Sequence, residues 1–263
     1  MNLRSQAILL ALDHISSSYQ GGEPLKIVEV GCMFKKDEGC STYYIADFLV
    51  KRGGGNRFVS IDSDLDHINT SKALIQNWNS HLSKVIEYRH GPSSSVLPEV
   101  LTDLNNVHFV YLDGGAHPEI CLFEFEQAMI HLAPEGIILV DDAQQIPPSE
   151  HYRLPRHFGK ATLILPMLIV ANYLPERRKV HATNAMTEDQ KSIPQSNFIG
   201  QLRNIDVPTV GASNFNVIGS RHRMLAYGSP TFIAKTRQLT ETVGPIEIGR
   251  ALRYLMSSKR LGD

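Results

Sequence analysis

The chain has 263 residues, which is long enough for one sizeable hydrophobic core or for one core with an appendage. Its 26 Lys and Arg residues and 27 Asp and Glu residues give a formal net charge of -1. This balance argues against a general polyanion binder, because phosphate backbones need a concentrated positive surface. We therefore expect no nucleic-acid partner.

The cysteines and the apolar runs bear on where the protein works. Cys32, Cys40 and Cys121 have neither the spacing of a zinc site nor the density of a disulfide scaffold, which indicates a reducing cytoplasm. The apolar run 161–174 is shorter than the roughly 20 residues of a membrane-spanning helix, and residues 7–12 are too few for a signal-peptide core. We expect a cytoplasmic protein without a membrane partner, and the sequence leaves a homo-oligomer open.

After an N-terminal helix at residues 3–18, short apolar strands alternate with helices. The predicted strands are 26–31, 57–62, 84–90, 107–113 and 136–142. The predicted helices are 41–52, 65–78, 95–104 and 119–132. Strands that are apolar on both faces and alternate with helices indicate a parallel sheet covered on both sides. We therefore predict an α/β fold with a Rossmann-like, doubly wound and mostly parallel sheet.

Beyond residue 142 the alternation weakens, and we predict a single domain over 1–263 with its core at 26–142. The later predicted elements are a helix at 161–174, strands at 179–184 and 223–228, and a C-terminal helix within 244–258. The polar segment from about 187 to 221 is long for a loop in a compact domain, which is typical of a lid or an insertion. A surface excursion or an oligomer contact is the alternative.

The ends of the predicted strands carry residues suited to holding a ligand. They are Glu29, Gly31, Asp62, Gly91, Asp113, Asp141 and Asp142. In doubly wound sheets, ligands bind beyond the carboxyl ends of the strands. Because these residues come from successive strands, we expect them to gather at one edge of the sheet.

The first strand lacks the G-x-G-x-x-G phosphate fingerprint, and the acidic Glu29 would repel a phosphate but suit a cationic amino-acid ligand. Asp62 stands where a carboxylate grips ribose hydroxyls, with a helix cap or turn as its alternative role. The chain also lacks a Tyr-x-x-x-Lys pair near the sheet. A nicotinamide-dependent dehydrogenase therefore fits least well.

Residues 26–142 resemble the class I methyltransferases that use S-adenosylmethionine. More narrowly, they look like the metal-dependent O-methyltransferases related to catechol and caffeoyl-coenzyme A O-methyltransferases, and like sugar and natural-product O-methyltransferases of similar pattern. The most telling segment is Gly91–Pro98, which is similar to that family's Gly-Ala-Ser-Gln-Asp segment beside the adenine. The resemblance implies a seven-stranded sheet and S-adenosylmethionine as the cofactor.

The resemblance also implies which residues hold the cofactor. They are Glu29, Gly31, Ser41 and Thr42 for the methionine portion, Asp62 for the ribose, Gly91, Pro92 and Ser93 for the adenine, and Asp113 at the end of the fourth strand. The loop before Ser41 departs from the family's shorter loop by an insertion at 35–38.

Asp113, Asp141 and Asp142 are predicted to converge, and three like charges in one cleft repel unless a cation joins them. A hard divalent cation such as Mg²⁺ takes oxygen ligands, and the resembling family holds its metal with Asp, Asp and Asn. We therefore predict a Mg²⁺ site at these three residues. The alternative is a metal-independent enzyme, because many methyltransferases of this fold keep such acidic residues without binding a metal.

The catalytic residues follow from the same comparison. The resembling catechol enzymes place a basic Lys three residues after the first Asp, and here that position is Ala116. His117 is the candidate general base, since an unperturbed histidine titrates near pH ~6.5, and Asp113 is the second candidate catalytic residue. The alternative role of His117 is to cap the helix that starts near Glu119.

The resemblance implies an O-methyltransferase that acts on a small hydroxylated molecule. A related hydroxylase-like enzyme with the same aspartates is one alternative. A non-catalytic, methyltransferase-like binding subunit is another, favoured by the missing Lys at Ala116.

Overall fold

The computed structural model describes residues 3–20, 22–35, 40–114, 117–145, 160–164, 168, 215–218 and 222–236. The chain divides into two compact units. The first comprises 1–161 and 214–242, and the second comprises 162–213 and 243–263. Of the second unit only 162–164 and 168 are described, and Leu163, Ile164 and Leu168 are buried. The single domain expected from the sequence stays a prediction.

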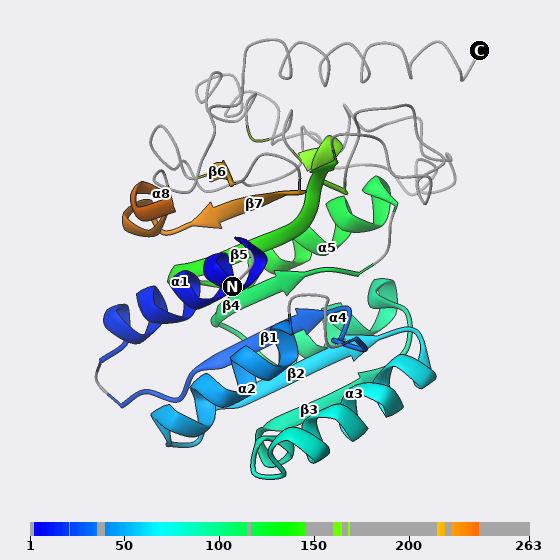
Figure 1. Cartoon of the computed structure of the whole chain (residues 1–263). Coiled ribbons are helices and arrows are strands. Elements are labelled where there is room, and N and C mark those ends of the chain that lie inside the picture. Colours follow the sequence, from blue (N-terminus) through cyan, green and yellow to red (C-terminus); the bar gives the residue numbers. More distant parts are fainter. Residues whose placement is uncertain are drawn as a thin grey trace, which may run out of the picture. The chain divides into compact units, whose positions relative to one another are not determined.

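The first unit is built on one sheet (Figure 1). Its strands are β1 (Lys26–Val30), β2 (Arg57–Asp62), β3 (Ile86–His90), β4 (Val107–Leu112), β5 (Leu132–Gln145), β6 (Phe215–Ile218) and β7 (His222–Gly228). The seven strands lie in the order β3-β2-β1-β4-β5-β7-β6. The pairs from β3 to β5 are parallel, whereas β7 runs antiparallel to both β5 and β6. The predicted Rossmann-like, mostly parallel fold is confirmed.

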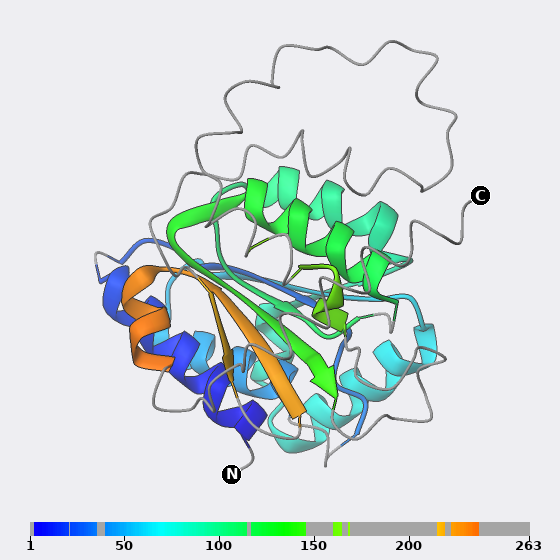
Figure 2. The same ribbon diagram turned by 90° about the horizontal axis from the view of Figure 1, so that it is seen from above.

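Helices cover both faces of this sheet, with α4 beside α5 on one face and α1, α2 and α3 on the other (Figure 2). The helices are α1 (Leu3–Ser18), α2 (Ser41–Arg52), α3 (Leu65–Trp78), α4 (Ser93–Leu104), α5 (Pro118–Ile130) and α8 (Pro230–Thr236), with 3-10 turns η1 (Leu82–Val85) and η2 (Lys160–Thr162). Because β4 lies between two covered faces, all six of its residues are buried. This explains why its sequence is an almost continuous apolar run.

The strand order places β1 beside β4, so that the connections from these two strands leave in opposite directions. Ligands of doubly wound sheets bind at such a switch point. Backbone hydrogen bonds hold the strand ends together: Gly31 N donates to Ile61 O at 2.8 Å, and Asp113 N donates to Val30 O at 2.8 Å. The predicted site residues therefore share one edge.

Two parts of the sheet differ from the sequence prediction. The strand predicted at 136–142 is longer at both ends, because Leu132 already pairs with Val107 across a register shift and the chain continues to pair with β7 as far as Gln145. The segment 187–221, predicted to be a lid or an insertion, contains the strand β6. This strand is held by backbone hydrogen bonds to β7, and the residues of β6 alone do not show that pairing. The rest of that segment lies outside the described residues.

The other predicted elements up to residue 113, the helix predicted at 119–132 and the strand predicted at 223–228 are found with small shifts, and α8 was not predicted. Of the helix predicted at 161–174, the structure describes only 161–164 and 168, where the 3-10 turn η2 ends at Thr162, and the rest lies outside the described residues. The predicted strand at 179–184 and the C-terminal helix within 244–258 lie outside the described residues. Cys32 and Cys121 are buried and Cys40 is partly buried, and these described cysteines form no disulfide.

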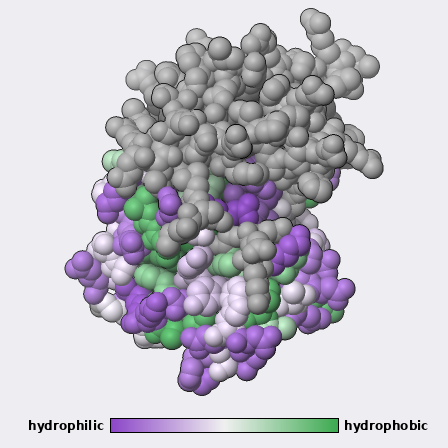
Figure 3. Space-filling view, in the orientation of Figure 1, coloured by the Kyte–Doolittle hydropathy of each residue, from purple (hydrophilic) through white to green (hydrophobic). Residues whose placement is uncertain are grey.

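The described surface carries few large exposed apolar side chains, among which Ile130 is the most exposed. On the face seen in Figure 3, the coloured surface is largely hydrophilic or intermediate, with separate hydrophobic areas. No helix among the described residues has the length and apolar character needed to cross a membrane.

Gly228 tests the junction between β5 and β7. Its φ is +127°, and an added Cβ would lie 2.2 Å from the carbonyl oxygen of Gly136. Gly228→Ala is expected to lower the free energy of unfolding by at least about 2 kcal/mol, because the backbone of β5 must move and the φ is unfavourable for alanine. Urea unfolding measures the change. Gly55→Ala is the control, since its Cβ would meet only Pro24 at 4.0 Å. Equal effects of the two substitutions would contradict the expectation.

Candidate functional site

The centre of the site is the close approach of two backbones after β1 and β4. Gly31 has φ +87°, and a Cβ there would lie 2.5 Å from the carbonyl oxygen of Asp113. Only glycine fits such a position without moving the neighbouring chain. At Gly31 and Asp113 the two loops therefore meet through backbone atoms rather than through side chains, and a ligand can approach this backbone closely.

Glu29 lies in β1, two residues before Gly31, and is fully buried. Its Oε2 accepts hydrogen bonds from the hydroxyls of Ser60 at 2.6 Å and Thr42 at 2.7 Å, and Thr42 Oγ1 in turn accepts one from Met33 N at 2.9 Å. Ser41 also lies near the carboxyl, but no hydrogen bond of acceptable geometry reaches Oε1 within the described part of the chain. Oε1 of Glu29 is thus a buried acceptor without a hydrogen-bond donor among the described residues.

The burial of Glu29 changes its acidity. Burial raises the pKa of Glu29 to about 7, although hydrogen bonds from the neighbouring hydroxyls oppose the rise. An acceptor without a donor inside the protein is costly. The roles expected of Glu29, Ser41 and Thr42 toward a ligand stay predictions.

Asp62 ends β2 and makes contacts that tie down two loops. Its Oδ2 accepts from Cys32 N at 3.0 Å and its Oδ1 from Asp64 N at 2.9 Å. The ring of His67 lies 3.6 Å from Oδ1 and stacks on Phe34 with 3.9 Å between ring centroids. The turn role considered for Asp62 is therefore present, and the carboxylate keeps further lone pairs for a ligand hydroxyl.

The segment Gly91–Ser93 begins α4 beside β2, and Gly91 N donates to Asp62 O at 3.0 Å. A buried carboxyl from α5 lies next to this segment. Ser93 lies near the carboxyl of Glu124, whose Oε1 lacks a hydrogen-bond partner among the described residues. A Cβ on Gly114 would lie 3.0 Å from that Oε1.

Burial raises the pKa of Glu124 to about 7, while the nearby Ser93 and the charge of Lys160 oppose the rise. Glu124 is thus a second buried acceptor at the end of the sheet. It lies beside the residues predicted to line an adenine, whose exocyclic amine carries N–H donors.

Asp141 and Asp142 lie where the pairing of β5 with β7 is irregular, between Val140 and Gln144. Asp142 has φ +46°, in the left-handed region, so successive carboxylates do not alternate as in a regular strand. Irregular pairing of this kind is common next to active sites, where it redirects side chains. It brings both residues toward Asp113, as the sequence predicted.

The carboxylate of Asp141 is buried and surrounded by donors. Its Oδ2 accepts from the hydroxyl of Tyr111 at 2.8 Å and pairs with Nε of Arg4, and its Oδ1 accepts from Asp142 N at 2.8 Å. Burial and the charge of Asp113 raise the pKa of Asp141, and the charge of Arg4 opposes the rise.

Two cations that the sequence analysis did not single out join the three aspartates. Arg4, from α1, pairs with Asp141 and also lies 3.8 Å from Asp113 and 3.7 Å from Asp142. Lys160, from η2, donates to Asp113 Oδ1 at 2.7 Å. Burial works against the charge of both, yet the aspartates raise the pKa of Arg4 and of Lys160 above their ordinary values, so both stay cationic.

This arrangement does not fit the predicted Mg²⁺ site. Within the described residues, no group of three or more His, Cys, Asp or Glu side chains is placed to hold a metal ion. The reason lies in the donors: Asp141 Oδ2 already faces Arg4 and Tyr111, and Asp113 Oδ1 already faces Lys160. The structure brings the three aspartates together around protein cations.

His117, the candidate base, is exposed and stands directly before α5. It occupies the N-cap position without a side-chain capping hydrogen bond, so the structure does not show the capping role considered for it. Its neighbour Ala116 lies outside the described residues.

Sequence reasoning missed Arg4, Lys160, Glu124 and His67. Each comes from a helix or turn rather than from a strand end, so the rule that located the aspartates could not find them. Arg4 and Lys160 lie far from the aspartates in sequence. Only an acidic residue among the apolar positions of α5, at Glu124, gave a local signal.

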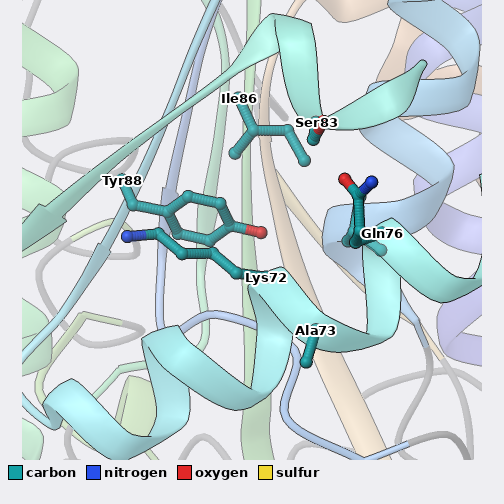
Figure 4. Close-up of a pocket in the computed structure, with 7 residues that line it drawn as sticks. Lys72, Ala73, Gln76, Ser83, Ile86 and Tyr88 are labelled. Carbon is teal, nitrogen blue, oxygen red and sulfur yellow. The ribbon is translucent and has the colours of Figure 1, made fainter. Parts of the chain in front are cut away.

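A cavity of about 440 Å³ lies elsewhere, against β3 at the edge of the sheet. Figure 4 shows Lys72 alongside the ring of Tyr88, with Gln76 reaching in from the same helix, α3. The cavity is lined from η1 and the first half of β3. It is therefore not formed by the strand ends that carry the predicted cofactor residues.

Comparison with known proteins gives the class. Residues 28–143 match the family model of the methyltransferase domain. The match runs from β1 to the irregular turn of β5, and thus includes Glu29, Gly31, Asp62 and the three aspartates. The resemblance predicted for residues 26–142 is confirmed, and this part of the chain is a methyltransferase domain. No curated protein matches the sequence.

Solved structures resemble the chain at low identity. MycE methyltransferase of mycinamycin biosynthesis, in complex with Mg and SAH, has a TM-score of 0.43 and 11% identity, covering 82% of this chain and 49% of that one. The CMeT domain of citrinin polyketide synthase has 0.42 and 15%, covering 80% and 48%. A methyltransferase from Geobacter sulfurreducens has 0.40 and 12%, covering 87% and 80%. Likenesses of this size carry no argument about the reaction.

The raised pKa of Glu29 makes stability depend on pH. Between about pH 4.5 and 7 the folded chain keeps a proton that the unfolded chain has released, so this carboxyl lowers the free energy of unfolding as pH rises. Glu29→Gln removes that dependence. The free energy of unfolding of the variant, relative to that of the unsubstituted protein, should therefore rise by up to about 3 kcal/mol between about pH 5 and pH 8.

Urea unfolding without ligand at several pH values measures this difference. Glu99→Gln, at an exposed position of α4, is the matched control and should leave the pH profile unchanged. Parallel profiles for Glu29→Gln and the unsubstituted protein would show that the carboxyl is not perturbed by its burial.

Proposed function

We propose that the protein binds S-adenosylmethionine at the carboxyl ends of β1, β2 and β4 and transfers its methyl group to the oxygen of a small hydroxylated acceptor. The observation that supports this best is the close approach of Gly31 to the backbone of Asp113, together with the buried Glu29, whose Oε1 has no partner among the described residues. A cationic amino acid with a flat nucleoside fits this combination better than a pyrophosphate does, because the site offers carboxylates and the sequence after β1 lacks the glycine-rich phosphate fingerprint.

Each part of the cofactor has a counterpart among the described residues. The methionine portion would lie over Gly31 and near Glu29, and the ribose beside Asp62. The adenine would lie against Gly91–Ser93, where the leftover oxygen of Glu124 can accept an N–H. The cofactor supplies a methyl group on a positively charged sulfur, which any nucleophilic oxygen held in line can take.

The protein's own task is then to hold the acceptor and receive its proton. Asp113 is partly exposed at the end of β4, next to Gly31, where it can orient an acceptor hydroxyl. His117 is the candidate proton acceptor, as an exposed side chain at the start of α5. Holding the oxygen in line with the sulfonium contributes much of the rate.

We do not include the predicted Mg²⁺ ion in this reaction, because Arg4 faces Asp141 Oδ2 and Lys160 faces Asp113 Oδ1. A hydroxylase-like reaction and a non-catalytic binding subunit remain the alternatives. Methyl transfer to a panel of phenols and sugars, measured with labelled cofactor, separates an enzyme from a binding subunit.

Asp62→Ala should weaken the binding of S-adenosylmethionine by several-fold to about a hundredfold, because charge-assisted hydrogen bonds are worth roughly 1.5–3 kcal/mol. Titration calorimetry measures the dissociation constant. Asp66→Asn, exposed in the first turn of α3, is the control and should bind normally. Unchanged affinity in a folded Asp62→Ala variant would rule out the ribose assignment, and no binding by the unsubstituted protein would rule out the cofactor.

A further inference from the structure

We propose that Arg4 and Lys160 take the place of a divalent cation at Asp113, Asp141 and Asp142, so that the protein binds no metal ion there. This inference rests on the contacts of the cluster and holds whether or not the protein transfers methyl groups. It concerns residues of α1 and η2, outside the strand ends where the site was expected.

The charges support this reading. Three carboxylates so close together need positive charge to stay in one cleft. A guanidinium and an ammonium bring two positive charges, as many as one divalent cation. Arg4 lies against all three carboxylates, and Lys160 adds a direct hydrogen bond to Asp113.

The hydrogen bonds support it as well. A carboxylate has about four lone-pair sites, and Asp141 uses three of them, for Tyr111, Arg4 and the backbone of Asp142. Mg²⁺ demands near-octahedral oxygen ligands at about 2.0–2.1 Å and keeps several waters. To meet that demand at Asp141, the contacts of the buried carboxylate would have to be broken.

Burial makes the cations hard to displace. The side chain of Lys160 is only 5% exposed, so an ion that took Asp113 from it would leave a buried ammonium without its partner. Arg4 is 23% exposed and is the more accessible of the two. A substitution of Arg4 is therefore the change that should open the carboxylates to a metal.

The test uses the full-length protein and Mn²⁺, a divalent probe that can be followed by electron paramagnetic resonance and by calorimetry. The unsubstituted protein should bind no stoichiometric Mn²⁺ at about 1 mM, and its Tm should not respond to Mn²⁺ or to EDTA. Arg4→Gln should bind one Mn²⁺ and gain about 2–4 °C or more in Tm when Mn²⁺ is added. Arg57→Gln, which removes an exposed arginine paired with Asp103, is the control and should behave like the unsubstituted protein.

Three results would overturn the proposal. Stoichiometric Mn²⁺ binding by the unsubstituted protein that is lost in Asp141→Asn would show a metal site in spite of the cations. Failure of both Arg4→Gln and Lys160→Met to bind Mn²⁺, each in folded form, would show that the cations are not what excludes the ion. Equal Mn²⁺ binding by Arg57→Gln and Arg4→Gln would show that the loss of Arg4 is not what opens the aspartates to the ion. If Arg4→Gln does not fold, the titration of the unsubstituted protein still decides the first point, and calorimetry with S-adenosylmethionine in EDTA reports separately on the proposed function.

Discussion

The contact between the backbones of Gly31 and Asp113 is the constraint on which the site depends. Two parallel strands can approach this closely beyond their paired region only where one of them has no Cβ. The strand order changes direction at the same place, so the loops separate and open the edge of the sheet. Near this contact Glu29 is fully buried, whereas Asp113 is partly exposed.

The first unit buries its acidic groups in two different ways. Glu29 and Glu124 have no cation at hydrogen-bond distance among the described residues, and each keeps one oxygen without a donor. Asp113 and Asp141 instead have protein cations against them. The first kind of carboxyl keeps an acceptor oxygen without a donor inside the described part of the fold. The second kind already has charged partners within the protein.

The sequence predicted the strand ends well because their polar residues interrupt runs of buried apolar ones, a local pattern. It could not predict Arg4 or Lys160, because nothing near these residues in sequence shows that α1 and η2 end against Asp141 and Asp113. The same holds for β6, whose partner strand comes after it in the chain. The net charge of the aspartate cluster could not be predicted either. The sequence shows three acidic residues at the strand ends, but the cations beside them are brought there by packing.

The position of Arg4 on the first helix has a consequence for how the protein forms. The aspartates lie on β4 and β5, so they come together when the middle of the sheet assembles, and until α1 has docked they repel one another. Docking of α1 on the sheet therefore brings one of the two cations that oppose this repulsion, and η2 brings the other. The edge of the sheet that would receive the ligands reaches its final electrostatic state only in the completed fold, which couples ligand readiness to the integrity of a helix that contributes nothing to the sheet itself.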